Sequence, residues 1–314
     1  MKNIRKLTEG AILLAVFSVL LLITFYIPVI GMVINLFLPV PFMLFAAKND
    51  WKSTAVFVIA SLLLSFLVGS ILSLPITIPY GLTGAVMGML IQKRKNSITI
   101  FISGSLVFLA NFIVIYIVSI YFFHVDMIQQ MIDLVRSSMN MSADMVKKMG
   151  QPGDYKKMLD QMNSGLNLVK TLIPTLFVIT SFFAVMIIQV VSFPILKRFG
   201  VKYENLKAFR DISLPRSLLW YYLFTMAASL LVHPQVGTYW HSALLNLTYI
   251  LFFLMVIQGF SLLFFFFHQR GMAKSASIPI AIISFVIPFL LYIVGILGIM
   301  DLGFDLRKRF VKKE

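Results

Sequence analysis

The amino-acid sequence predicts an all-α protein, a polytopic bundle of transmembrane helices with about eight or nine spans. Hydrophobic residues make up 60% of its 314 positions and charged residues only 12%, whereas a soluble domain carries roughly 25% charged residues. The apolar runs are continuous and reach roughly 20 residues, the length that a helix needs to cross a bilayer. They lack the strict alternation of barrel strands, and in lipid only helices or closed barrels satisfy the backbone.

Nine apolar stretches can be marked along the chain. They cover residues 10–28, 30–47, 53–71, 73–92, 98–122, 171–195, 218–233, 241–267 and 276–300. Lys2, Arg5 and Lys6 precede the first stretch, and further basic residues occupy alternate connections up to the loop after the sixth. Basic loops stay in the cytoplasm, so we expect a bacterial plasma-membrane protein whose N-terminus is cytoplasmic.

Three regions follow from this pattern. Residues 1–200 form a six-span module, 201–217 a basic cytoplasmic loop, and 218–314 a C-terminal membrane extension with a basic tail. Nine plain crossings would place the tail outside, against the charge bias. Three alternatives remain: stretch 218–233 does not cross, the last stretch breaks at Pro288 and re-enters, or the tail is external.

The longest hydrophilic segment, residues 124–169, lies between the fifth and sixth spans. It carries five basic and five acidic residues, and its apolar positions recur at helical spacing. Residues 150–153 (Gly-Gln-Pro-Gly) interrupt this pattern as a strong helix breaker. We therefore expect an extracytoplasmic helical hairpin that extends the two spans.

The sequence offers little that could support catalysis. No Asp, Glu, Lys or Arg lies deep inside the nine stretches, and an acid–base pair is missing. Cysteine is absent, and His233 and His241 flank one connection without an evident third metal ligand. We expect no enzyme activity, no metal and no cofactor. The net charge of +15 resides in short loops, so lipid rather than nucleic acid is the expected partner.

Uncharged polar residues gather in the outer halves of spans 2, 4 and 5. They are Asn35, Thr77, Tyr80, Asn111 and Tyr116. Prolines in the sequences LPVPF and LPITIPYG break two of these helices. Broken helices are tolerated where they are buried in protein or line a cavity. The pattern predicts a small outward-opening substrate pocket, and helix kinks without a ligand are the alternative.

Small residues mark two helix faces. Ala11 and Ala15 lie four apart in the first span and let another helix approach closely. Gly81, Gly84 and Gly88 form a denser set in span 4, for which we expect packing inside the molecule.

The first six spans resemble the S component of energy-coupling-factor vitamin transporters. The shared features are six spans with both ends inside, Ala-xxx-Ala in span 1, a Pro-containing span 2 and a Gly-rich span 4. This resemblance implies that Ala11 and Ala15 contact a partner helix and that a small molecule binds near the outer surface. Over its whole length the chain resembles the YybS family of uncharacterised bacterial membrane proteins. Three passages carry that match: KLTEGAILLAVFSVLLL, LPVPF and FRDISLPRSLLW.

The sequence therefore predicts small-molecule binding or transport in a complex with other membrane subunits. No nucleotide-binding P-loop occurs in the chain, so any use of ATP requires a partner ATPase. The alternative is a non-transporting scaffold or regulator, which holds partners through the hairpin and the basic loops.

Overall fold

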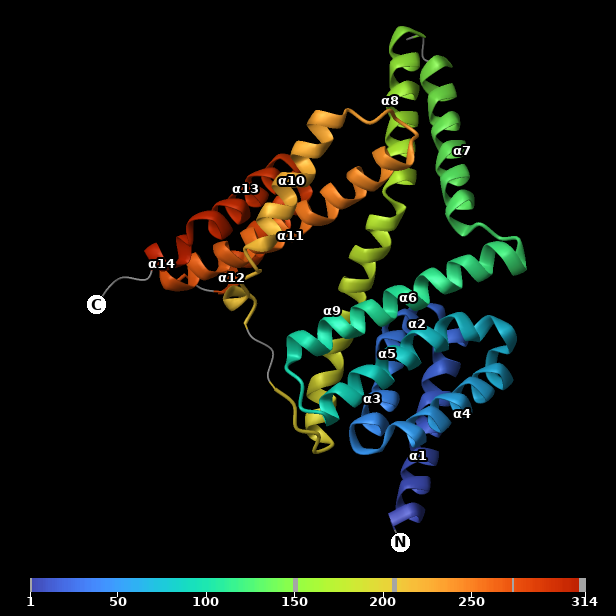
Figure 1. The fold of residues 1–314 in the computed structure, drawn as a ribbon. Coiled ribbons are helices and arrows are strands. Elements are labelled where there is room, and N and C mark those ends of the chain that lie inside the picture. The colour runs from blue at the N-terminus through green and yellow to red at the C-terminus, as the bar shows by residue number, and fades with distance from the viewer. Residues whose placement is uncertain (1, 149–151, 205–207, 273, 311–314) are drawn as a thin grey trace. The chain divides into compact units, whose positions relative to one another are not determined.

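A computed structural model describes residues 2–148, 152–204, 208–272 and 274–310. All regular secondary structure within these residues is helical, which confirms the all-α prediction (Figure 1). The chain divides into two compact units. Unit 1 comprises Met1–Gly150 and Phe177–Leu206, and unit 2 comprises Gln151–Leu176 and Lys207–Glu314.

Unit 1 contains the helices of the first six apolar stretches and α7 from the hydrophilic segment between the fifth and sixth. They are α1 (Lys2–Tyr26), α2 (Pro28–Ile34), η1 (Asn35–Phe37), α3 (Pro39–Lys48), α4 (Trp51–Gly69), η2 (Ser70–Ser73), α5 (Leu74–Gln92), α6 (Ser97–Phe123), α7 (Met127–Lys148) and most of α9 (Ile173–Arg198). Proline opens α2 and α3, where its missing N–H costs nothing. Asp50 and Asn96 cap α4 and α6 by accepting bonds from backbone N–H groups three residues on.

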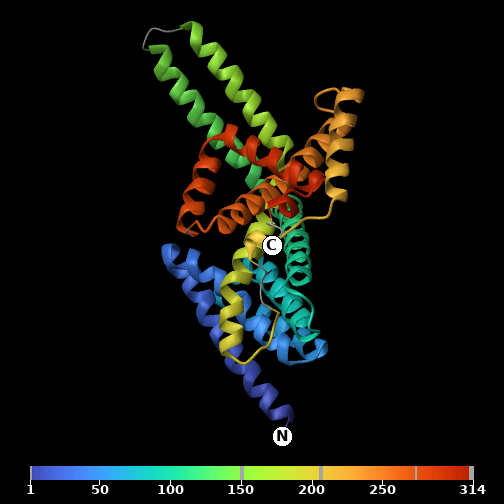
Figure 2. The same ribbon diagram turned by 90° about the vertical axis from the view of Figure 1, so that its left-hand side faces the viewer.

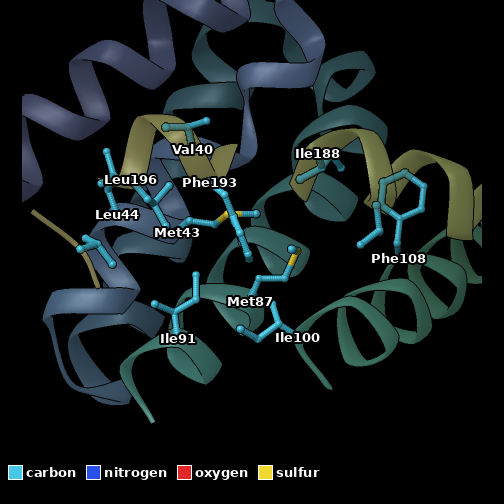
Figure 3. Close-up of a cluster of buried hydrophobic side chains, with 12 residues drawn as sticks. Val40, Met43, Leu44, Met87, Ile91, Ile100, Phe108, Ile188, Phe193 and Leu196 are labelled. Carbon is cyan, nitrogen blue, oxygen red and sulfur yellow. The ribbon is translucent and has the colours of Figure 1, made fainter. Parts of the chain in front are cut away.

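The core of unit 1 lies where α3, α5, α6 and α9 meet. Figure 3 shows Met43, Met87 and Phe193 among the buried side chains that fill the space between these helices. A second cluster joins α1, α3 and α4, in which the Phe42 ring meets Phe17 and Phe57 edge to face at centroid distances of 5.1 and 5.4 Å. Helix α1 lies at the edge of unit 1, and its N-terminal end projects beyond the other helices of the unit (Figures 1 and 2).

Unit 2 contains the C-terminal helices. They are α8 (Pro152–Thr171), η3 (Phe209–Asp211), α10 (Ser217–Val232), α11 (Tyr239–Gln269), α12 (Lys274–Val286), α13 (Pro288–Phe304) and α14 (Leu306–Phe310). The segment 124–169, predicted as one hairpin, thus contributes α7 to unit 1 and α8 to unit 2. Gly150 and Gln151 of the predicted breaker, and the tail residues 311–314, lie outside the described residues.

Helices α11 and α13 lie against each other and run in the same direction (Figure 1). Gly295 faces the Phe252 ring and Gly298 faces the Met255 carbonyl, so contacts advance by three residues along both helices. The backbones nearly touch: a Cβ on Gly298 would lie 1.9 Å from that carbonyl oxygen. Glycine is therefore the residue that permits this approach.

Helices α12 and α13 meet at Pro288 with a bend of 116°. Helix α12 runs back along α11, since Phe285 stacks on Phe260 at a centroid distance of 5.3 Å. Helix α13 then runs forward along α11 again. The sequence-based alternative in which the last stretch breaks at Pro288 thus has a helix break at that residue, and the bend suits either a broken span or a re-entrant segment.

Each of the nine predicted apolar stretches is largely helical. By length and composition, six segments of the described residues suffice to cross a membrane, or seven with the bent pair. One of these segments, Trp51–Gln92, comprises both α4 and α5, and α10 is shorter than the rest. The fold is that of a multi-pass membrane protein, with six or seven candidate spans by this measure against the eight or nine predicted from the sequence.

Candidate functional site

Two of the five predicted pocket residues meet in unit 1. Asn35 lies where α2 gives way to η1, and its Nδ2 donates a hydrogen bond to Tyr80 Oη at 3.1 Å. The other amide atom, Asn35 Oδ1, is buried and accepts no hydrogen bond within the described residues. An unsatisfied buried acceptor costs about 1–3 kcal/mol. Within the described residues, Thr83, Ser105 and Ser192 also carry a buried oxygen without a partner, and Asn35 is the one of these four whose side chain also bonds a second predicted pocket residue.

Aromatic rings connect Tyr80 with a third predicted residue, Tyr116. The Tyr80 ring packs edge to face on the Phe108 ring, with centroids 5.6 Å apart. The Phe112 centroid lies 6.4 Å from that of Phe108, one turn further along α6. Phe177 of α9 then contacts both Phe112 and Tyr116, with centroids 4.7 and 5.4 Å away. Sequence reasoning missed the three phenylalanines. The signal was present, because Phe108, Phe112 and Tyr116 recur every four residues and so share a helix face.

The other predicted polar residues are engaged elsewhere. Thr77 Oγ1 lies 2.6 Å from Ser65 Oγ, which in turn donates to Ser73 Oγ at 2.7 Å. This buried hydroxyl cluster fixes the turn between α4 and α5. Asn111 Nδ2 donates to the Val107 carbonyl of its own helix at 2.7 Å, and Tyr116 Oη makes a long bond of 3.4 Å to Asp126.

The three glycines of α5 lie against α3. A Cβ on Gly84 would lie 2.6 Å from the Pro39 carbonyl oxygen, and one on Gly88 would lie 2.6 Å from that of Met43. A Cβ on Gly81 would meet the Phe42 ring at 3.0 Å. Close packing of α3 on α5 is thus built on glycine. The same two helices position Asn35, the first residue of η1, four residues before α3 begins, against Tyr80.

Ala11 and Ala15 lie on the exposed side of α1. The opposite side is buried through Phe17 and Leu21, which pack on α3 and α4. The two alanines therefore take no part in the core of unit 1. Their small side chains leave a shallow strip on the surface of the helix.

Sequence reasoning missed a buried charge just beyond the last apolar stretch. Asp301 follows the last predicted stretch directly, and in α13 it is only 4% exposed. Arg307 Nε donates to Asp301 Oδ2 at 2.9 Å, and Gln258 Nε2 donates to the same oxygen at 2.5 Å. Gln258 was the available signal, because an amide in the middle of an apolar run needs a polar partner.

This polar network holds the loop that precedes α10. Arg307 Nη1 donates to the Arg210 carbonyl at 2.9 Å, and Gln258 Oε1 accepts from Leu214 N–H at 2.9 Å. Ser261 Oγ accepts from Arg307 Nη2 and lies within donating distance of the Phe209 and Ile212 carbonyls. The junction FRDISLPRSLLW is thus fixed to α11 and α14.

An ion pair at the surface reinforces the same junction. Arg216, which directly precedes α10, forms an ion pair with Asp305, which follows α13. Lys308 Nζ lies 3.0 Å from the Oδ2 atom of the same carboxylate. The hydrogen bonds from Arg216 and Lys308 hold the pKa of the Asp305 carboxyl below its usual value. Elsewhere, no three His, Cys, Asp or Glu side chains gather in the part of the chain that the structure describes. His233 ends α10 in a left-handed conformation.

Comparison with known proteins extends these observations. Residues 15–302 match the family described as "Predicted membrane protein (DUF2232)". The "Uncharacterized protein YybS" of Bacillus subtilis (strain 168) is 32% identical over 309 residues, which cover 98% of this chain and 99% of that protein. No solved structure matches. The resemblance to YybS therefore extends over nearly the full length.

Proposed function

The chain belongs to the DUF2232 family of membrane proteins, and we propose that it binds a small polar molecule as one subunit of a larger membrane complex. The proposal rests on the side-chain amide of Asn35. Its Nδ2 donates to Tyr80 Oη, whereas its buried Oδ1 accepts no hydrogen bond within the described residues. A buried acceptor in a membrane protein is costly unless something donates to it. The role is binding or transport, without catalysis.

The surroundings of Asn35 define the kind of ligand. It would present an N–H or O–H group to Asn35 Oδ1 and an apolar or aromatic face to Tyr80 and Phe108, whose rings lie 5.6 Å apart. Small ligand sites in proteins commonly combine a few fixed polar groups with an apolar lining. A small heterocycle or aromatic alcohol fits this description better than an ion.

Other subunits would supply what the chain lacks. The exposed Ala11 and Ala15 suit close contact with a helix of a partner subunit. Without a P-loop in the sequence, hydrolysis of ATP would take place on a partner. The clustering of basic residues in alternate loops supports a plasma-membrane location with a cytoplasmic N-terminus.

Native mass spectrometry of the protein purified in mild detergent tests the proposal. We expect the parent protein to carry a bound small molecule and Asn35→Leu to lose it. Asn111→Leu is the matched control, because the Asn111 amide donates to its own helix. Thermal unfolding of both variants establishes that the fold persists. No bound molecule in the parent, or equal retention by Asn35→Leu, would contradict binding and favour a scaffold.

A further inference from the structure

A hollow lies at the end of unit 1 where α1, α3 and α9 come together. It has a volume of about 750 Å³, and its polar wall consists of Arg5, Thr8, Glu9 and Lys48. Lys48 is held by an ion pair with Glu9 at 2.8 Å. Neighbouring Lys6 pairs with Asp50, and this hydrogen bond holds the pKa of the Asp50 carboxyl well below its usual range. The acidic groups nearby are therefore already neutralised.

The rest of the wall is apolar. Leu13, Leu44 and Phe199 line the hollow, and Leu13 follows Arg5 by eight residues on α1. Because a helix rises 1.5 Å per residue, Leu13 lies about 12 Å deeper along the helix axis than Arg5. The hollow thus changes from cationic to apolar over the distance that separates a lipid headgroup from the upper part of its acyl chain.

A second hollow, of about 200 Å³, adjoins the first. Both are lined by Lys48, and the second adds Arg94 and Lys202. Within the described residues, Arg5, Arg94 and Lys202 make no ion pair. Together with Lys48 they form a cationic floor, and Glu9 is the acidic residue among those that line the two hollows.

We propose that the two hollows form one binding site for an anionic phospholipid. The phosphate lies between Arg5 and Lys48, the rest of the headgroup extends toward Arg94 and Lys202, and an acyl chain follows Leu13 and Leu44. Basic residues at a membrane surface attract anionic lipids, and a basic pocket adds a fixed position for the headgroup. The apolar wall distinguishes this site from one for a soluble anion. The proposal is independent of the small-molecule site at Asn35.

Lipid competition on the full-length protein in neutral detergent tests the assignment. Phosphatidylglycerol, phosphatidylcholine with the same acyl chains, and glycerol 3-phosphate are added separately, and bound adducts are counted by native mass spectrometry. We expect phosphatidylglycerol to be retained at higher collision energy than phosphatidylcholine, and glycerol 3-phosphate to be lost. Arg5→Gln and Arg94→Gln should each weaken phosphatidylglycerol binding about fivefold.

Two further variants separate a built site from general charge attraction. Lys95→Gln removes the same charge from the same loop, but Lys95 lines neither hollow, so binding should not change. Thr8→Trp keeps every charge and fills the larger hollow, so binding should fall while the unfolding temperature in detergent holds. Equal retention of the two lipids, equal effects of Arg94→Gln and Lys95→Gln, or full binding by Thr8→Trp would each overturn the proposal. Retention of glycerol 3-phosphate comparable to the lipid would overturn it in favour of a soluble anion.

Discussion

At the scale of single residues, the buried carboxylate of Asp301 depends on its partners. Arg307 and Gln258 donate hydrogen bonds to this carboxylate. Arg307 also donates to the Arg210 carbonyl and to Ser261 Oγ. A buried ion pair adds little by itself, but removal of one partner leaves an uncompensated charge, which costs about 3–5 kcal/mol. The pair therefore matters chiefly because it fixes one arrangement of the junction before α10.

Substitution of Arg307 tests this view. Arg307→Met leaves the Asp301 carboxylate with only Gln258, so we expect a loss of about 3–5 kcal/mol in the free energy of unfolding. The double variant Asp301→Asn/Arg307→Met should lose less than the sum of the single variants, as expected for residues in one network. Denaturant titration of purified protein, followed by circular dichroism, measures all three.

The control for this prediction lies at the same junction. Arg216 also forms an ion pair, with Asp305, but its side chain is 62% exposed. Exposed pairs contribute about 0–1 kcal/mol, so Arg216→Met should have a small effect. Equal losses for Arg307→Met and Arg216→Met would refute a special role for the buried pair.

At the scale of helices, glycine decides which surfaces can meet. In unit 1 the glycines of α5 let the backbone of α3 approach closely, and in unit 2 Gly298 of α13 does the same for α11. In lipid there is little hydrophobic gain from bringing two apolar helices together, so close packing of this kind supplies much of their attraction.

Two glycines of α13 provide a matched test. Gly298→Ala would place a Cβ 1.9 Å from the Met255 carbonyl oxygen, so the helices must separate. We expect a loss of about 1–3 kcal/mol or more in unfolding free energy. The nearest atom to a Cβ on Gly303 is Leu219 Cδ2 at 3.6 Å, an ordinary contact. Gly303→Ala should therefore be neutral or stabilising, because alanine favours helix. Similar destabilisation by both substitutions would contradict the packing argument.

The exposed alanines of α1 allow a test at the level of association. Ala15→Trp adds a large side chain where a partner helix would approach, so co-purification of membrane partners should fall while the unfolding temperature stays unchanged. Val16→Trp is the control, because Val16 is 44% exposed but points about 100° away around the helix. Partner yields that are equal for the two variants would argue against docking through Ala15.

The sequence predicted helices well and contacts between helices poorly. Apolar runs and prolines located the helices and the break at Pro288, since these are local properties of the chain. The Asn35–Tyr80 pair joins residues 45 apart, and the Gln258–Asp301 pair joins residues 43 apart. Which polar groups meet depends on helix rotation and register, and periodicity alone does not fix either. Thr77 shows this, because its hydroxyl group meets that of Ser65 on α4, a contact that the sequence pattern did not indicate.

At the scale of the whole molecule, charge and connectivity together define a membrane topology. Arg307 binds the Arg210 carbonyl, so the segment after α13 lies at the same end of unit 2 as the basic loop before α10. If the bent pair of α12 and α13 is re-entrant, the chain returns to that end without another crossing. We therefore expect the basic loop and the segment after α13 to lie together in the cytoplasm.

Cysteine labelling in intact cells tests this topology on a clean background, because the parent chain has no cysteine. Val236 lies in the connection between α10 and α11 and is 87% exposed, so Val236→Cys should react with a membrane-impermeant maleimide. Lys308→Cys, at a side chain that is 80% exposed, should react only after the membrane is permeabilised. Labelling of Lys308→Cys in intact cells, together with protection of a cysteine at Arg216, would mean that the tail is external. The contact between Arg307 and the Arg210 carbonyl would then not form in the membrane, because these two residues would face opposite sides.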